Sequence, residues 1–204
     1  MDLAALRTAL QQRLGLPSVG DGLATTTVQT AVINSALRDL SNEYDWPWLI
    51  SSASLTFSSG TAAFPTGCLR ARELTINGRP AKFVPLAHFL GVAGDSSDYV
   101  WTTQATTVKI TPVPDTAPTA VLYFVRSEPE LSGDSDVPLL PEAYHDVLLA
   151  RAAYRANVTR NHMDESVRDD NDYQLQVRKM KSASWARTGP RGVRRAGVVN
   201  WARW

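Results

Sequence analysis

The spacing of hydrophobic residues changes twice along this chain of 204 residues, and these changes constrain the fold more than any other feature. Stripes at helical spacing come first, an alternation of apolar and polar residues follows, and helical spacing then returns. Spacings near 3.6 and 2 residues are those of amphipathic helices and half-buried strands. The sequence therefore predicts an α+β protein: a helical bundle of two N-terminal and two C-terminal helices, with an inserted, mainly antiparallel β region.

Two helices are expected within residues 1–49. The first ends near Gly15, and the second begins at one of the threonines at 25–27 and ends at about Asp45, because Pro47 disfavours helical geometry at the residue before it. Trp46-Pro47-Trp48 has two interpretations: a stacking platform for a ligand, or a plug where the helical and β parts meet; we favour the plug. The two stripes are Leu3, Leu6, Leu10 and Leu14, and then Ile33, Leu37, Leu40 and Tyr44.

The inserted β region is expected to span residues 50–127. Asn77-Gly78 is a strong signal for a tight hairpin, with residues 82–84 as a candidate returning strand. A second hairpin is predicted around Gln104-Ala105. Residues 119–126 are apolar on both faces, as is typical of a central strand. The other expected elements are a strand at 53–57 and one or two helical turns within 85–92.

Two further helices are expected within residues 128–187. Pro141 suits the first position of a helix, and Ala143, Val147, Ala150 and Tyr154 then form a stripe. The last helix, from about 163 to 186, is polar and would be about 35 Å long. Its thin apolar seam is too weak for the core of a single subunit, so we predict that it contacts a second copy of the chain. The predicted subunit-interface residues are Val167, Tyr173, Val177 and Met180.

Acidic residues gather in the first half of that last helix, and they have two interpretations. They could form a metal or cation cluster. They could also form a solvated face whose negative charge interacts favourably with the positive N-terminal end of the helix, and we expect the solvated face. They are Asp164, Glu165, Asp169, Asp170 and Asp172.

The C-terminal segment is basic and aromatic, whereas the rest of the chain is acidic. Residues 173–204 carry eight cations and no acid, and the whole chain carries +1, so the first 172 residues carry −7. Residues 188–204 show neither the helical spacing nor the alternation of a strand. We therefore predict an extended arm that becomes ordered on a partner. Folding back onto the acidic body, or binding DNA, are the alternatives. The predicted partner-binding residues are Arg187, Arg191, Arg194, Arg195, Trp201, Arg203 and Trp204.

Catalytic and metal-binding motifs are not evident. His88, His145 and His162 have no metal-ligand spacing, and Cys68 is the single cysteine. His145 beside Asp146 could transfer protons, but a partly exposed helical histidine is the favoured interpretation. We therefore predict a protein that is not an enzyme and that needs no metal or cofactor. The N-terminus does not resemble a signal peptide and no apolar run is long enough to cross a membrane, so synthesis in a cytoplasm is expected.

The order and spacing of several segments resemble the head-to-tail adaptor (connector) proteins of tailed bacteriophages. The resemblance covers roughly residues 25–160. It rests on the helix pair that ends in Asp45-Trp46-Pro47-Trp48-Leu49, the β region, and three later segments. These are Lys109 to Pro114, Tyr123 to Leu131, and Val137 to His145, the last of which opens an alanine-rich helix.

This resemblance implies a structural virion protein at the head–tail junction. It implies a ring of subunits, most often twelve, that docks under the portal protein and leads DNA through its lumen towards a downstream tail or head-completion protein. A mildly acidic body suits such a channel, because phosphate contacts would retain the DNA. The competing classes are a nucleic-acid-binding module that uses the arm, another virion or surface β-domain protein, and an enzyme with an unrecognised site.

Overall fold

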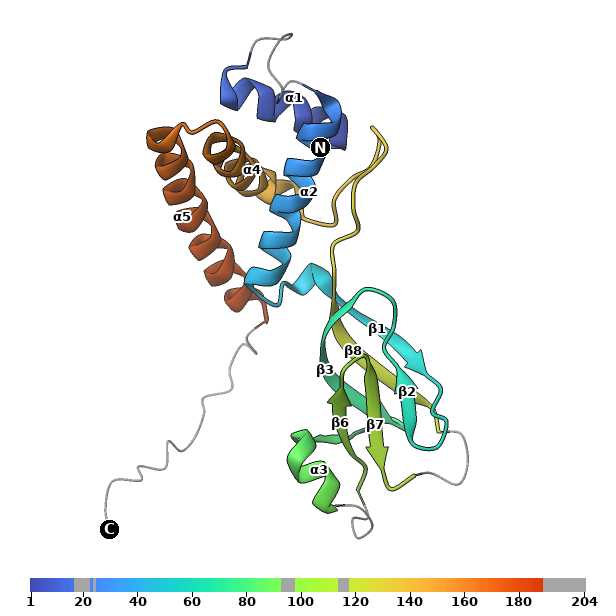
Figure 1. Cartoon of the computed structure of the whole chain (residues 1–204). Coiled ribbons are helices and arrows are strands. Elements are labelled where there is room, and N and C mark those ends of the chain that lie inside the picture. The colour runs from blue at the N-terminus through green and yellow to red at the C-terminus, as the bar shows by residue number, and fades with distance from the viewer. Residues whose placement is uncertain (17–22, 24, 93–97, 114–117, 189–204) are drawn as a thin grey trace, which may run out of the picture.

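The computed structural model describes residues 1–16, 23, 25–92, 98–113 and 118–188 of the chain. A helical part and a β part lie end to end and are joined by two segments of the chain (Figure 1). The chain enters the β part after the second helix and returns from it before the fourth. The predicted α+β class, with helices on both sides of an inserted β region, is confirmed.

The helical part contains both ends of the described chain. The first helix begins with the side chain of Asp2, which accepts a hydrogen bond from the backbone N–H of Ala5 at 2.9 Å, and it ends at Gly15 in a left-handed conformation. Ala143, expected within a helical stripe, lies in a 3₁₀ turn (Glu142–Tyr144) and is exposed. The four helices are α1 (Leu3–Leu14), α2 (Thr26–Glu43), α4 (His145–Thr159) and α5 (Met163–Thr188).

The β part consists of two four-stranded sheets and one short helix, α3 (Leu86–Val92). The first sheet has the order β1-β8-β3-β4 and the second the order β2-β7-β6-β5. β8 pairs with β1 and β3 on its two edges, as predicted for the doubly apolar segment. The strands are β1 (Ile50–Leu55), β2 (Thr61–Ala63), β3 (Cys68–Ile76), β4 (Arg79–Pro80), β5 (Lys82–Phe83), β6 (Val100–Gln104), β7 (Thr107–Thr111) and β8 (Ala120–Arg126).

Both predicted hairpin turns are present, but one returning strand was wrongly predicted. Asn77 and Gly78 have φ values of 52° and 77° and join β3 to β4, a strand of only two residues. Residues 82–83 do not return along β3. They instead form β5, which pairs in parallel with β6 in the other sheet. Pro80 explains the short return, because proline cannot donate a ladder hydrogen bond and so ends the pairing with β3.

Each part has its own hydrophobic core. The helical core is rich in leucine and alanine, whereas the β core lies between the facing sides of the two sheets. Two buried residues of the connecting segments, Leu49 and Val125, belong to the helical core even though Val125 is part of strand β8. The two connections therefore fasten the β part to the helical core by apolar contact.

Candidate subunit and partner interfaces

The apolar seam of α5 serves the core of its own subunit. Tyr173, Val177 and Met180 are each 2% exposed and pack in the helical core, where α5 lies against α4. The expectation that these three residues wait for a second copy is wrong. These side chains belong to the same buried cluster as the alanines of α4, so they already have partners within the subunit. Val167, by contrast, is 60% exposed, so its role in a subunit contact stays a prediction.

A buried carboxylate fixes α5 to α1 and α4. Asp169 is 1% exposed and accepts hydrogen bonds from Arg13 at 3.0 Å and from the side-chain amide of Asn157 at 2.9 Å. Arg13 also donates to Asp172 at 2.8 Å. Burial alone would lower the pKa of Arg13, but its hydrogen bonds to Asp172 and Asp169 raise the pKa above its ordinary value. The hydrogen bonds from Arg13 and Asn157 take the place of water around the Asp169 carboxylate, which would be costly to bury without partners.

A second charged network joins α2, α4 and α5. Arg151 donates to Asp39 at 2.7 Å and to Asp170 at 3.3 Å, and Arg155 donates to Asp39 at 2.6 Å. Burial alone would raise the pKa of Asp39, but the hydrogen bonds from Arg155 and Arg151 lower it below the ordinary value. Asp169, Asp170 and Asp172 are therefore partners of arginines on other helices, so the expected solvated face is wrong for these three residues.

The rings of Trp46 and Trp48 close the end of α2, as favoured from the sequence. Trp46 is fully buried, stacks on Trp48 with a centroid distance of 4.9 Å, and donates its indole N–H to the carbonyl of Leu40 at 2.6 Å. Tyr144 extends the cluster at 5.8 Å from Trp48. No open aromatic platform remains at Trp46, and the motif fixes the helical end of the joint.

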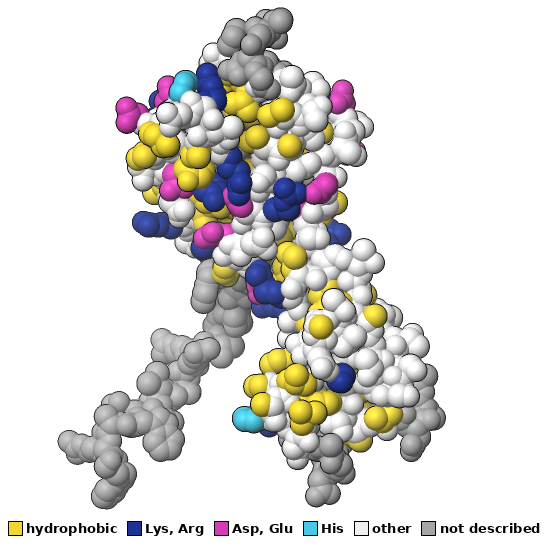
Figure 2. Space-filling model, viewed as in Figure 1, with side chains coloured by type: hydrophobic (Ala, Val, Ile, Leu, Met, Phe, Trp, Pro, Cys, Tyr) yellow, Lys and Arg dark blue, Asp and Glu magenta, His cyan; other side chains and the backbone are white. Residues whose placement is uncertain are grey.

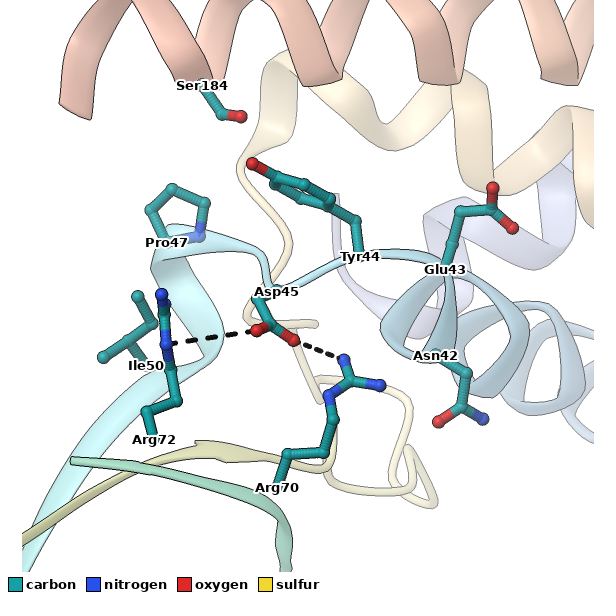
Figure 3. Close-up of a pocket in the computed structure, with 9 residues that line it drawn as sticks. All are labelled: Asn42, Glu43, Tyr44, Asp45, Pro47, Ile50, Arg70, Arg72 and Ser184. Carbon is teal, nitrogen blue, oxygen red and sulfur yellow. Dashed lines mark ion pairs between the residues drawn. The ribbon is translucent and has the colours of Figure 1, made fainter. Parts of the chain in front are cut away.

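A cleft of about 400 Å³ lies at the joint between the two parts. Asp45 points into it and pairs with Arg70 at 2.6 Å and with Arg72 at 3.9 Å, both from β3 (Figure 3). Ser184, near the end of α5, also lines this cleft, so the C-terminal end of α5 lies at the joint. This ion pair was not predicted from the sequence, although two arginines two residues apart on one strand were a signal for a charged face.

The predicted arm lies outside the described residues. Arg187 falls within α5, but its side chain is not described, and Arg191, Arg194, Arg195, Trp201, Arg203 and Trp204 follow the last described residue. Their role as partner-binding residues stays a prediction.

Burial shifts the pKa of two titratable side chains, those of His145 and Cys68. His145 is 1% exposed, not partly exposed as expected, and its ring lies 3.0 Å from the carbonyl oxygen of Leu140. Burial is the main reason that its pKa is lowered. Burial likewise raises the pKa of the half-buried Cys68 thiol. Among the described residues, no group of three histidine, cysteine or acidic side chains is arranged to hold a metal ion.

Comparison with protein families identifies the chain. The family model described as "SU10 adaptor protein" matches residues 1–197, which is nearly the whole length. The chain therefore belongs to the SU10 adaptor protein family, a family of phage head-to-tail adaptors. Members are structural proteins of the virion that associate with portal and tail proteins. No curated protein matches the chain. Within the described residues, no helix is long and apolar enough to span a bilayer.

Proposed function

We propose that this protein forms a ring, of twelve copies, under the portal and continues the DNA channel from the head into the tail. The family match over residues 1–197 carries this proposal, because it assigns the chain to head-to-tail adaptors. The charge distribution supports it: residues 1–172 carry −7, so most of the subunit repels a phosphate backbone that must slide past it. The protein is made in the host cytoplasm and works at the head–tail junction, where a tail or head-completion protein binds below it.

Subunit contacts in this ring must come from surfaces other than the buried seam of α5. The outer side of that helix keeps three large apolar side chains exposed, at 53–60%. We infer that these side chains contribute to a subunit contact, because a second copy that covers them would remove apolar surface from water. They are Met163, Val167 and Leu175.

The basic C-terminal arm is proposed to anchor the ring to the portal. Its tryptophans provide rings for pockets at an interface, and its arginines provide bidentate partners for carboxylates. The helix that precedes the arm reaches the joint, because Ser184 of α5 lines the cleft there. Binding of the arm to DNA would be distinguished by the experiment below.

The copy number is tested by measuring mass and symmetry of the head–tail junction in assembled particles. Several copies around one axis are expected, and a single copy per particle would contradict the ring. The arm is tested by removing residues 189–204, which leaves every described helix and strand in place. The truncated protein should fold with unchanged circular dichroism and fail to dock on portal-bearing heads. Docking with unchanged affinity would exclude the arm as anchor, and loss of DNA binding alone would favour the nucleic-acid alternative.

A further inference from the structure

Strand β1 forms one edge of its sheet and pairs with another strand on one side alone. Its six residues lie opposite residues 120–125 of β8, and the order β1-β8-β3-β4 leaves β1 without a second neighbour among the described strands. Ser52 and Ser54 are exposed, and Ile50 is 40% exposed. In an antiparallel pair, alternate residues direct their N–H and C=O groups away from the partner strand. The open side of β1 therefore offers a row of backbone groups that a further strand can bind.

The other edges in the described part of the two sheets carry features that prevent strand pairing. β2 has three residues, β4 has two and ends in Pro80, and β5 has two and begins with Lys82. The part of β3 beyond β4 contains two register shifts and carries Arg70, Arg72 and Glu73. Short length, proline, charge and bulges all protect an edge from pairing with another chain. β1 has none of them, because its six residues are uncharged, include no proline and pair with β8 without a register shift.

The end of the chain has the composition of a strand that fits this edge. The visible surface over β1 is uncharged, whereas charged side chains gather on the helical part (Figure 2). Residues 198–204 contain no glycine or proline, and four of the seven are β-branched or aromatic: Val198, Val199, Trp201 and Trp204. The other segments of several residues outside the described part each contain glycine or proline, which interrupt a strand. They are residues 17–22, 93–97 and 114–117.

The arm is long enough to bring residues 198–204 onto β1 of its own subunit. Ser184 and Ile50 line the same cleft, so the C-terminal end of α5 lies near the start of β1 (Figure 3). Residues 189–197 span at most about 30 Å when extended, whereas the six residues of β1 span about 20 Å. This linker therefore reaches the far end of β1 at Leu55, and its three glycines and one proline allow the chain to reverse there. The last residues then return antiparallel to β1, as in every other pair of this sheet.

We propose that residues 198–204 bind the open edge of β1 in the same free subunit, as an additional antiparallel strand. Main-chain hydrogen bonds provide the affinity, as they do wherever an extended segment is added to a sheet edge. Because the strand and the edge belong to one chain, the pairing does not depend on protein concentration. The covered edge is no longer open to strands of other copies, so free subunits are protected from edge-to-edge association.

The portal then competes with β1 for the same residues. The pairing is a property of the free subunit, whereas its release rests on the proposed anchoring of the arm to the portal. A portal site withdraws the segment when it binds the arm more tightly than β1 does. The arm is thus kept from contacts with other copies until the subunit reaches a head, and the edge of β1 opens at that point.

Hydrogen–deuterium exchange of the full chain in solution tests the pairing. In full-length Asn200→Pro/Ala202→Pro, the amide groups on the open side of β1 should exchange about tenfold faster than in the wild type, because proline breaks the added strand. Val193→Pro places the same residue in the linker and should leave this exchange unchanged. A wild-type rate equal to that of the double variant would overturn the inference.

Cross-linking identifies the copy that provides the strand. The variant Ser52→Cys/Ala202→Cys, in a Cys68→Ser background, is treated with a short bis-maleimide. Links within one chain are expected, at the mass of the monomer and at every protein concentration. The matched pair Ala87→Cys/Ala202→Cys moves one cysteine to an exposed position of α3 and should give no link. Linked dimers would overturn the inference, because they would assign the strand to a second copy.

Measurements on portal-bearing heads separate this inference from the proposed function. β1 of docked wild-type subunits should exchange as fast as in the double proline variant, because the portal holds the arm. Exchange as slow as in the free subunit would overturn the release. Docking that needs residues 189–204, together with β1 exchange that the prolines do not change, would overturn the pairing and leave the anchor standing. Pairing in solution, together with docking that persists without these residues, would instead overturn the anchor and leave the pairing standing.

Discussion

The helical part and the β part of this protein are stabilised in different ways. In the helical part, apolar packing is combined with buried polar groups, among them Asp169, Asn157 and His145. In the described residues of the β part, Thr102 is the buried polar residue, and no charged side chain is buried. In β7, Val108 and Ile110 are buried and alternate with less buried neighbours, so a slip of this strand by one residue would turn its apolar set outward.

This difference teaches how a polar helix acquires a fixed position. α5 has a narrow apolar face, so apolar contact alone would tolerate rotation or sliding of the helix along α4. Any such shift would leave the carboxylate of Asp169 buried away from Arg13 and Asn157, and an unpaired buried charge is costly. The charged contacts therefore give α5 its specific register, and the apolar contacts give the free energy of packing.

The largest expected effect comes from removing this buried carboxylate. Asp169→Ala leaves the buried amide of Asn157 without its acceptor and removes one of the two carboxylates that bind Arg13, so the free energy of unfolding should fall by about 1–3 kcal/mol. Urea unfolding followed by circular dichroism measures this value. The matched variant Asp172→Ala removes the second partner of Arg13, but this carboxylate is 36% exposed and should cost about 1 kcal/mol or less. Equal losses in the two variants would show that burial of Asp169 is not the source of the register.

The sequence was sufficient to predict what depends on local pattern. The end of α1 at Gly15, the end of α2 before Pro47, the Asn77-Gly78 turn and the central position of β8 all follow from residues within a few positions of each other. Lys82 and Phe83 were assigned to the wrong partner, because two residues carry too little pattern to choose between two sheets.

Contacts between distant segments explain the errors at the candidate interfaces. The polarity of α5 was interpreted as a face for water or for a second copy, because Arg13 and Arg151 lie 156 and 19 residues from the carboxylates that they bind. Arg151 and Arg155 are one helical turn apart on α4, and this spacing was a usable signal for a charged face. Nothing in the local pattern, however, indicated Asp39 as the shared acceptor.

The charged contacts of the helical part should also make the stability of the protein depend on pH. The pKa of Asp172 is lowered mainly by its hydrogen bond from Arg13, and the pKa of Asp39 is lowered by Arg155 and Arg151 against the opposing effect of burial. A carboxyl group with a lowered pKa in the folded state contributes its full stabilisation above its ordinary value, 3.8 here, and loses it as the pH falls below that value. The protein should therefore lose stability between about pH 4 and pH 2.

Unfolding in urea at several pH values measures this loss. Asp172→Asn should be slightly less stable than the wild type at pH 7, and its stability should fall less steeply in acid. Each carboxylate contributes about 1 kcal/mol or less, because both are partly exposed to solvent. An acid slope that is unchanged in Asp172→Asn would place the titrating groups elsewhere.

The smallest expected effect concerns the joint between the two parts. The ion pairs of Asp45 with Arg70 and Arg72 connect the parts, but these side chains are 36–45% exposed. Arg70→Ala/Arg72→Ala should therefore lower the free energy of unfolding by less than about 1 kcal/mol and keep a single unfolding transition. Arg79→Ala on the neighbouring strand β4 is the matched control for loss of an exposed arginine. Val125 and Leu49 remain buried in the helical core in all these variants, and they still couple the parts. A loss of several kcal/mol, or two separate transitions, would instead mean that the charged joint, and not this apolar contact, holds the β part on the helical part.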